Sequence, residues 1–512
     1  MCVRLPYYKY FFSLVCLRIS SGGVSTPPIF MPSPVAFRIA ENDNLLMVKH
    51  RLLFFIIFTA VILLPAGHVS AQEALSPNAD TTTLSYALRK GRFELHLRYY
   101  YMRTNNDKDL TDYYAHAVGG GMKYETGSFK RFSLGIGGFF TWNIGSSDLT
   151  RPDPSTGIYN RYEIGQFDIE NPSNKNNMDR LEDFYLKYKF PKSAIIIGKQ
   201  QINTPFINPQ DGRMRPNSEQ GVWSDIQSIK RTRIRAGWLT KISPRGTVRW
   251  FDMDESIGVY SSGINASGGK SNYKGNLSSK GVGILGLEYA LQPQWKLQAW
   301  EFFTENIFNT LMVQTDGEWS FGNQEAVIAG LMYIHQDALN NGGNKDPAKT
   351  YFVPGQSSNI ISGRLGYRQR SNMLLLNYTR ITGDGRFLFP REWGREPLYT
   401  FIRRERSEGY GDMSALSVNL LNDFSKKRIK TELSYGYYAL PGITNYRLNK
   451  YGMPSYHQVL ADVQYQFAGF MRGLGFEIMY TYKLQAGSTE NQKAIINKVN
   501  MGHFNFIVNY HL

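Results

Sequence analysis

The sequence predicts an all-β protein, an antiparallel transmembrane β-barrel of 18 strands. Three observations support this fold: apolar and polar residues alternate, short turns alternate with long connections, and the final segment is amphipathic to its end. Alternation alone also fits a soluble β-sandwich or sugar-binding protein of the periplasm. The connections and the aromatic residues near strand ends therefore separate the two classes.

The first element of the chain is an export signal in residues 47–71. It has a basic start, an apolar run and small residues before Gln72. This order is typical of a secretory signal peptide, whereas a membrane anchor needs a longer apolar run of about 20 residues. Residues 1–46 precede the complete signal, so we interpret them as an over-called start that is absent from the mature protein.

The mature chain, expected to span 441 residues from Gln72, is basic and has no cysteine. Cys2 and Cys16 both precede it, which excludes disulfides, thiolate metal sites and a cysteine nucleophile. The full chain has 58 Lys and Arg against 42 Asp and Glu; without the six basic and two acidic residues of 1–71, 52 and 40 remain, a net charge of +12. An exported chain of this charge is expected to meet anionic lipid or anionic solutes, not nucleic acid.

The remaining composition fits a membrane barrel better than a helical membrane protein. No segment after the signal approaches 18 consecutive apolar residues, and the mean hydropathy is −0.36. Aromatic residues make up 14% of the chain, and 48 residues are Gly. In a barrel only alternate residues face lipid, which keeps the mean hydropathy low.

A lead of residues 72–91 precedes the barrel, which is expected to span residues 92–512. In residues 93–99 the odd positions are apolar or aromatic, and the even positions are Glu, His and Arg. Residues 285–299 form a hairpin around Gln-Pro-Gln, with Leu, Tyr, Trp and Ala on one face. Side chains alternate between the two faces of a strand, so each segment has one apolar face.

Eight short polar turns are separated by mostly longer connections, such as 145–178, 252–282, 335–360 and 381–412. With both chain ends on one side, eight turns imply nine hairpins and 18 strands. At roughly 9–11 residues each, these strands use under half of the mature chain, and the long loops use most of the rest. The turns are predicted at 125–131, 189–193, 240–247, 291–295, 316–323, 368–372, 423–428 and 467–475.

The chain ends in a segment that is typical of exported barrels. In residues 504–512, large apolar side chains occupy alternate positions up to Leu512, where a terminal aromatic residue is commoner. Barrel-assembly machinery reads final amphipathic strands of this kind, so we expect it as a partner during insertion.

Residues 198–223 resemble the third loop of the OprD family of outer-membrane porins, which carries a similar D-x-R-x-x-P…G pattern. The matching positions are Asp211, Arg213, Pro216 and Gly221. Order and spacing agree over nearly all of the mature chain. Further matches lie at 239–245, 286–308, 383–385, 472–474 and 507–512.

This resemblance implies a Gram-negative outer-membrane barrel of 18 strands, often a homotrimer, with the third loop folded into the lumen. It also implies uptake of small carboxylate-bearing molecules past a ladder of arginines on the inner wall. The turn count independently places 203–222 as the third long connection. The sequence departs from the family at 430–437 and 475–480, where no inward arginine is present, so carboxylate specificity is not carried over.

A substitute for that ladder is predicted in the strand of residues 231–238. Its even positions suit lipid, which places Arg231, Arg233 and Arg235 in the lumen as a basic rail. Charges of one sign in a narrow pore attract anions, and the planar guanidinium can bind carboxylate in a bidentate way. In the alternative, Arg231 lies at the rim and the others pair with Asp or Glu. Arg364 and Arg368 share the inward phase.

The pore constriction is predicted in the third loop, at Asp211, Arg213, Arg215 and Pro216. These charged side chains would line the opening. In the alternative, Asp211 and Arg213 pair with each other and only hold the shape of the loop. Prolines in this segment cannot serve central strands, which supports the assignment as a loop.

Catalysis and metal binding find no support in the sequence. The eight histidines are scattered without an H-E-x-x-H motif, and no G-x-S-x-G elbow is present. We therefore predict no catalytic residue, metal or cofactor. The predicted function is a porin for small anionic or carboxylate-bearing solutes, and the alternatives are a general non-specific porin and a surface adhesin or binding barrel.

Overall fold

The computed structural model describes residues 83–210, 212–322 and 324–512. The predicted start 1–46, the signal peptide 47–71 and most of the lead lie outside the described residues. The described chain begins with helix α2 (Leu84–Arg89), capped by Thr83, whose Oγ1 accepts a hydrogen bond from Tyr86 N at 3.2 Å.

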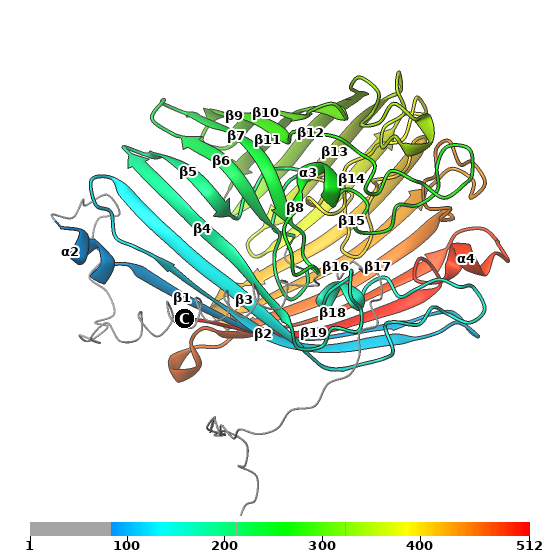
Figure 1. Ribbon diagram of the computed structural model, residues 1–512, viewed down its shortest axis with the longest axis horizontal. Coiled ribbons are helices and arrows are strands. Elements are labelled where there is room, and N and C mark those ends of the chain that lie inside the picture. Colours follow the sequence, from blue (N-terminus) through cyan, green and yellow to red (C-terminus); the bar gives the residue numbers. More distant parts are fainter. Residues whose placement is uncertain (1–82, 211, 323) are drawn as a thin grey trace, which may run out of the picture. The chain divides into compact units, whose positions relative to one another are not determined.

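Eighteen strands of the described chain close into one antiparallel barrel (Figure 1). They are β1 (Arg92–Asn105), β2 (Tyr113–Glu125), β3 (Phe132–Ser146), β4 (Met178–Phe190), β5 (Ser193–Gln200), β6 (Ser218–Ile226), β7 (Thr232–Ser243), β9 (Val282–Gln292), β10 (Trp295–Thr304), β11 (Phe308–Phe321), β12 (Glu325–Ala338), β13 (Ser357–Gln369), β14 (Asn372–Ile381), β15 (Met413–Phe424), β16 (Ile429–Ala439), β17 (Tyr456–Gln466), β18 (Leu474–Gln485) and β19 (Met501–His511). Neighbours in sequence pair, and β1 closes the sheet by pairing with both β2 and β19. The predicted 18-stranded barrel is confirmed.

The other described elements are short and lie in the connections. A two-residue strand, β8 (Phe251–Asp252), pairs with the end of β7. The short helices are α3 (Met253–Ser256), α4 (Gln492–Ile495), η1 (Ile164–Gln166), η2 (Pro347–Lys349), η3 (Ser425–Lys427) and η4 (Gly469–Met471).

Each strand presents an apolar face outward and a more polar face inward. In β14, Leu374 and Leu376 are 50% and 47% exposed, whereas Asn377 and Thr379 on the other face are buried. Because side chains alternate along a strand, the outward faces together form the band that lipid contacts in a membrane barrel.

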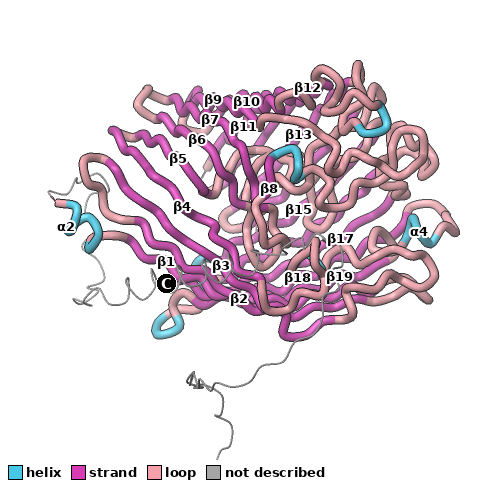
Figure 2. The backbone as a smooth tube through the Cα atoms, in the orientation of Figure 1, coloured by secondary structure: helices cyan, strands magenta, loops and turns pink. Residues whose placement is uncertain are grey.

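Nine loops and eight short turns lie on opposite rims of the barrel (Figure 2). The loops are the first (106–112), second (147–177), third (201–217), fourth (244–281), fifth (305–307), sixth (339–356), seventh (382–412), eighth (440–455) and ninth (486–500). Parts of the three longest, the second, fourth and seventh, line a cavity inside the barrel.

The turn predicted at 240–247 is wrong, because these residues end β7 and begin the fourth loop. The turn on the opposite rim lies at 227–231; it has no Gly or Pro, and its last residue adopts a positive φ of 60°. The Pro-Arg-Gly sequence at 244–246 is equally typical of a short turn and of a long loop, so it did not distinguish the two. The wrong turn and the missed turn cancel, so the strand count is right. The turn predicted at 316–323 is also misplaced, since β11 continues to Phe321.

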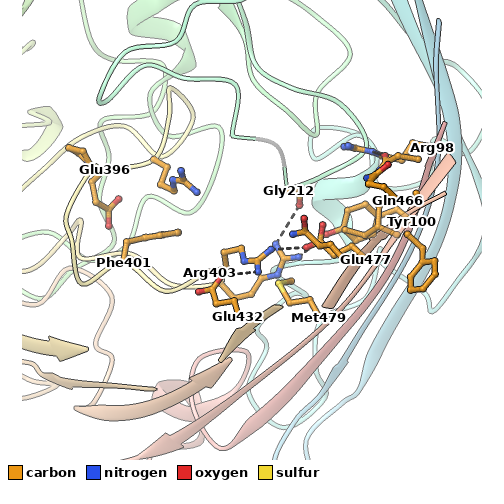
Figure 3. Close-up of a pocket in the computed structure, with 18 of the residues that line it drawn as sticks. Arg98, Tyr100, Gly212, Glu396, Phe401, Arg403, Glu432, Gln466, Glu477 and Met479 are labelled. Carbon is orange, nitrogen blue, oxygen red and sulfur yellow. Dashed lines mark hydrogen bonds and ion pairs between the residues drawn. The ribbon is translucent and has the colours of Figure 1, made fainter. Parts of the chain in front are cut away.

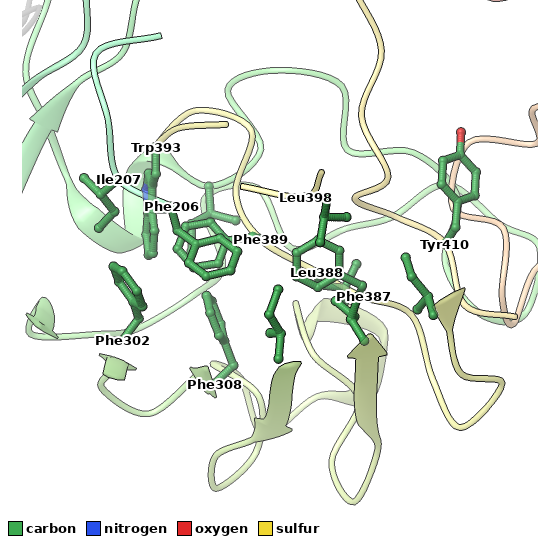
Figure 4. Packing of buried hydrophobic residues seen from close by; sticks show 14 of the residues in the cluster. Phe206, Ile207, Phe302, Phe308, Phe387, Leu388, Phe389, Trp393, Leu398 and Tyr410 are labelled. Carbon is green, nitrogen blue, oxygen red and sulfur yellow. The ribbon is translucent and has the colours of Figure 1, made fainter. Parts of the chain in front are cut away.

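The third loop folds into the lumen, as predicted, and packs there against the seventh loop (Figure 4). Phe206 and Ile207 are fully buried, and the Phe206 ring stacks on Phe389 with centroids 4.7 Å apart. Trp393 lies over the same cluster, with its ring centroid 5.6 Å from that of Phe389 and 6.1 Å from that of Phe308. This aromatic cluster fixes where the two loops meet.

Candidate functional site

Two cavities meet inside the barrel. One, of about 690 Å³, lies toward the short turns and is lined by inner-wall residues of β1, β16, β17, β18 and β19. The other, of about 620 Å³, lies among the long loops. Both are lined by five residues that we name the constriction: Gly212, Arg395, Phe401, Arg403 and Arg404. The boundary between the cavities is therefore formed by the third and seventh loops.

Close backbone packing positions the seventh loop at the constriction. Asn208 Nδ2 of the third loop donates a hydrogen bond to the Arg395 carbonyl oxygen at 2.9 Å. A Cβ atom on Gly394 would lie 1.8 Å from the Phe206 carbonyl oxygen, so only glycine permits this approach. Arg395 follows directly and stacks its guanidinium over the Phe401 ring, 4.9 Å from the centroid.

Four arginines surround the third loop beside the constriction. This arginine cluster consists of Arg213, Arg245, Arg404 and Arg406. Arg213 and Arg404 donate to the Gly212 carbonyl oxygen at 2.7 Å and 3.5 Å, and Arg245 donates to the Gln210 carbonyl oxygen at 3.1 Å. Within the described part of the chain, no Asp or Glu forms an ion pair with any of the four. Among the described residues, their direct partners at the third loop are therefore carbonyl oxygens and not carboxylates.

Burial and mutual repulsion both act on the arginine cluster. Burial, together with the charge of Arg404, lowers the pKa of Arg213 to about 10, and burial with Arg213 nearby lowers the pKa of Arg245 to about 9. Both pKa values stay above neutral pH, so the guanidinium groups remain charged. Buried like charges without a counter-charge are stabilised by a bound anion.

A buried ion-pair network joins the second, seventh and eighth loops to β18. Glu405 is paired with Arg161 at 2.9 Å and with Lys483 at 3.1 Å, and Glu408 is paired with Lys450 at 2.9 Å. We name this group the loop network, and its members are Arg161, Arg391, Glu405, Glu408, Lys450 and Lys483. It holds the loop side of the constriction in place.

Acidification is expected to loosen the loop network. Burial alone raises the pKa of Glu408, but the charges of Lys450 and Arg391 outweigh it and lower the pKa to about 2 from an ordinary value of 4.5. A carboxylate whose pKa is lower in the folded state stabilises that state at every pH above its pKa in the unfolded chain. This stabilisation is lost as the pH falls through the pKa of the folded state. The protection of amides in residues 382–412, corrected for the intrinsic pH dependence of amide exchange, should therefore be constant from neutral pH to about pH 5 and fall as the pH approaches 2. A loss of protection already above about pH 5 would contradict this assignment.

The structure divides the predicted constriction residues. Asp211 lies outside the described residues. Arg213 belongs to the arginine cluster, and its carbonyl oxygen accepts a hydrogen bond from Arg98 at 2.7 Å. Arg215 is 1% exposed and donates to the Met178 carbonyl oxygen at 2.8 Å. The Pro216 carbonyl oxygen accepts from Arg180. Arg215 and Pro216 thus attach the loop to the wall and line neither cavity.

The residues predicted as a basic rail have separate environments. Arg231 lies in the turn before β7 and is exposed. Arg233 pairs with Asp225 at 2.5 Å, and Arg235 pairs with Glu288. These contacts correspond to the alternative in which the arginines pair with neighbouring carboxylates. β6 also separates this strand from the third loop.

Arg364 and Arg368 both point inward, with different partners. Arg368 pairs with Glu318. Arg364 lines the cavity near the short turns, donates to Asn377 Oδ1 at 2.9 Å and stacks over Tyr399, 4.3 Å from the ring centroid. Whether any of the predicted rail residues selects solutes stays a prediction.

Sequence reasoning missed Arg245, Arg404 and Arg406 as site residues. Their signal is the density of arginine in the seventh loop, where the run Arg403-Arg404-Glu405-Arg406 follows three further arginines in residues 382–395. The pattern is visible in the sequence, but nothing in it shows which arginines pair with carboxylates.

The described residues contain no group of His, Cys, Asp and Glu that could hold a metal ion. Among the same residues, no helix is long and apolar enough to cross a membrane.

Comparisons with known proteins find the same architecture in a family of porins. Residues 165–493 match the model of the outer membrane porin OprD family. The crystal structure of Pseudomonas aeruginosa OpdK with vanillate aligns with a TM-score of 0.63 at 15% identity, covering 83% of this chain and 99% of that one. Acinetobacter baumannii OccAB2 aligns with a TM-score of 0.65 at 15% identity, over 83% and 99%. P. aeruginosa OccK3 (OpdO) aligns with a TM-score of 0.61 at 14% identity, over 84% and 97%. No curated protein sequence matches the chain.

Proposed function

The chain belongs to the OprD family of outer-membrane porins, and from this premise we propose that its pore selects small anionic solutes, such as carboxylates, at the constriction. The observation that carries the proposal is the arginine cluster: Arg213 is buried, the other three arginines are half-buried, and none of the four has an ion-paired carboxylate in the described chain. In a low-dielectric passage such charges lower the energy of a passing anion and raise that of a cation.

The charge of the cavity on the loop side supports the same direction. In a family of outer-membrane porins this rim is extracellular, because the short turns face the periplasm. Nine Arg and Lys residues line this cavity against one glutamate, Glu405, which is itself paired within the loop network. A cavity lined by one sign of charge focuses the field and concentrates counter-ions at its mouth.

The constriction also contains features that suit a carboxylate. Arg404 has a planar guanidinium that can donate two parallel hydrogen bonds, and Arg395 presents a second one over Phe401. On the periplasmic side, Arg364 faces the next cavity. A solute leaving the arginine cluster therefore meets further guanidinium groups along its path. Vanillate, present in the OpdK structure, carries a carboxylate and is a suitable probe.

Single-channel recording in a planar bilayer under a salt gradient tests the proposal. We expect an anion-selective reversal potential that shifts toward zero in the variant Arg213→Gln/Arg245→Gln/Arg404→Gln. A focused charge changes local ion concentrations by about tenfold or more, so the anion-to-cation permeability ratio should fall by a comparable factor. The matched control is Arg231→Gln/Arg233→Gln/Arg235→Gln, which removes three charges from the predicted rail.

The outcomes separate the competing functions. A loss of anion preference in the control variant alone would assign selection to the rail instead of the arginine cluster. Openings without ion preference in the unmodified protein would make the chain a general non-specific porin. A folded barrel that shows no openings would favour the surface adhesin or binding barrel.

Assembly as a homotrimer and recognition by the barrel-assembly machinery stay predictions from the resemblance. Chemical cross-linking in native outer membranes should give a trimer band if the first prediction holds. Deleting the final residue, Leu512, should slow insertion if the last strand is the recognised segment.

A further inference from the structure

A short segment of the seventh loop lies directly against the inner wall of the barrel. The Thr400 carbonyl oxygen accepts a hydrogen bond from Tyr438 Oη of β16 at 2.6 Å. Three residues later, the Arg403 carbonyl oxygen accepts from Gln458 Nε2 of β17 at 2.7 Å. The backbone of residues 400–403 is thus attached to two neighbouring strands.

The Arg403 side chain contacts three carboxylates, one on each of three consecutive strands. Figure 3 shows Arg403 with two of them, Glu432 and Glu477. Its guanidinium lies 3.2 Å from Glu432 of β16, 2.9 Å from Asp462 of β17 and 2.7 Å from Glu477 of β18. The planar guanidinium presents five N–H donors and can serve several carboxylates at once, which an ammonium group does less well. One loop residue therefore bridges three wall strands.

An apolar contact accompanies these ion pairs. Ile402, 1% exposed, packs with Leu460 of β17 and Met479 of β18 in a cluster separate from the main loop core. A Cβ atom on Gly436 would lie 2.9 Å from Ile402 Cδ1, so glycine at this wall position leaves the space that the side chain fills.

The neighbouring arginine has a different environment, although it is adjacent in sequence. Arg404 donates to Tyr100 Oη at 2.7 Å and to Asn505 Oδ1 at 2.8 Å, on β1 and β19, and forms no ion pair with a described carboxylate. Three wall carboxylates compensate the charge of Arg403, whereas no described carboxylate pairs with Arg404.

We propose that Arg403 is a positioning residue, and that Arg403, Glu432, Asp462 and Glu477 form an ionic latch that holds the seventh loop in place and so sets the width of the constriction. Phe401 and Arg404 flank the latch and belong to the constriction. If the latch opens, both can move with the loop. The inference concerns the loop and not the solute, so it does not depend on anion selection.

Two variants separate the latch from a simple effect of lumen charge. Arg403→Gln removes a positive charge, whereas Glu432→Gln/Glu477→Gln removes two negative charges; both weaken the latch. We expect both to raise the frequency of stepwise conductance fluctuations about tenfold, equivalent to about 1.4 kcal/mol, while their reversal potentials shift in opposite directions. The matched control, Arg368→Gln, removes one inward positive charge on β13, outside the seventh loop, and should shift the reversal potential without added fluctuations.

The fluctuations decide the proposal. Unchanged fluctuations in both latch variants, or changes of opposite sign that follow the lumen charge, would overturn it. Heat-dependent electrophoretic mobility shows whether each variant has folded as a barrel. Arg403→Lys retains the charge and lacks the planar fork, so we expect an intermediate frequency of fluctuations and a normal reversal potential. If fluctuations are as rare in Arg403→Lys and in Glu432→Gln/Glu477→Gln as in the unmodified protein, Arg403 has no positioning role.

Discussion

Replacing Trp393 by alanine is expected to destabilise the packed loops by about 3–5 kcal/mol, because it removes the largest buried side chain of the aromatic cluster. The Trp393 ring contacts Phe308 and Phe389, and Nε1 donates to Ser256 Oγ at 2.8 Å. Trp393 therefore links the seventh loop to β11 and to the fourth loop. The third loop, stacked on Phe389 through Phe206, should loosen with it.

The measurement is hydrogen exchange of loop amides in the bilayer-reconstituted protein, because the strands of the barrel keep their own hydrogen bonds. Exchange should accelerate in residues 201–217 and 382–412 and remain unchanged in the strands. Trp142→Ala is the matched control, since Trp142 is 45% exposed on the outward face of β3. Equal loop exchange in the two variants would show that Trp393 does not hold the loops.

Replacing Glu405 by alanine is the second large change, with an expected cost of about 3–5 kcal/mol to the loop network. Glu405 is 2% exposed as a side chain and pairs with Arg161, Lys483 and, at 3.6 Å, with Arg391. Its removal leaves buried cations that lose their counter-charge. The second and seventh loops should separate, because the pair between Arg161 and Glu405 joins them.

Limited proteolysis detects this separation, since arginine in both loops provides trypsin sites. Cleavage within 147–177 and 382–412 should become rapid in Glu405→Ala and stay slow in Asp148→Ala, which loses an exposed pair with Arg151 and two local hydrogen bonds from Thr150. Slow cleavage in both variants would mean that apolar packing alone secures the loops. The variant should also respond less to acidification than the unmodified protein.

The sequence was sufficient for the barrel because strand periodicity is a local property. Alternation in segments such as 285–299 and the spacing of turns led to 18 strands, and the structure confirms the count. The turn at 227–231 was missed because it lacks Gly and Pro, the residues that mark turns most strongly. Composition alone did not distinguish it from its flanking strands.

The site was only partly predictable. Arg213 and the inward third loop followed from the resemblance in residues 198–223; in the structure Gly212 of this loop lies at the boundary between the cavities, and Arg213 lines the cavity on the loop side. For Arg233 and Arg235, the inward phase was readable from alternation, but their partners Asp225 and Glu288 lie on other strands. Ion pairing depends on which strands become neighbours and in which register.

By itself, the sequence determined the fold class, the number of strands, the membrane-facing alternation and the family of this protein, because each follows from local periodicity, turn chemistry or short motifs. Only the tertiary structure decided which of the described arginines pair with carboxylates. Arg403 and Arg404 are adjacent in sequence, yet the first faces three wall carboxylates and the second faces hydroxyl and amide groups. Electrostatic energy depends on distances in space, and these distances are set when the seventh loop packs against the closed barrel.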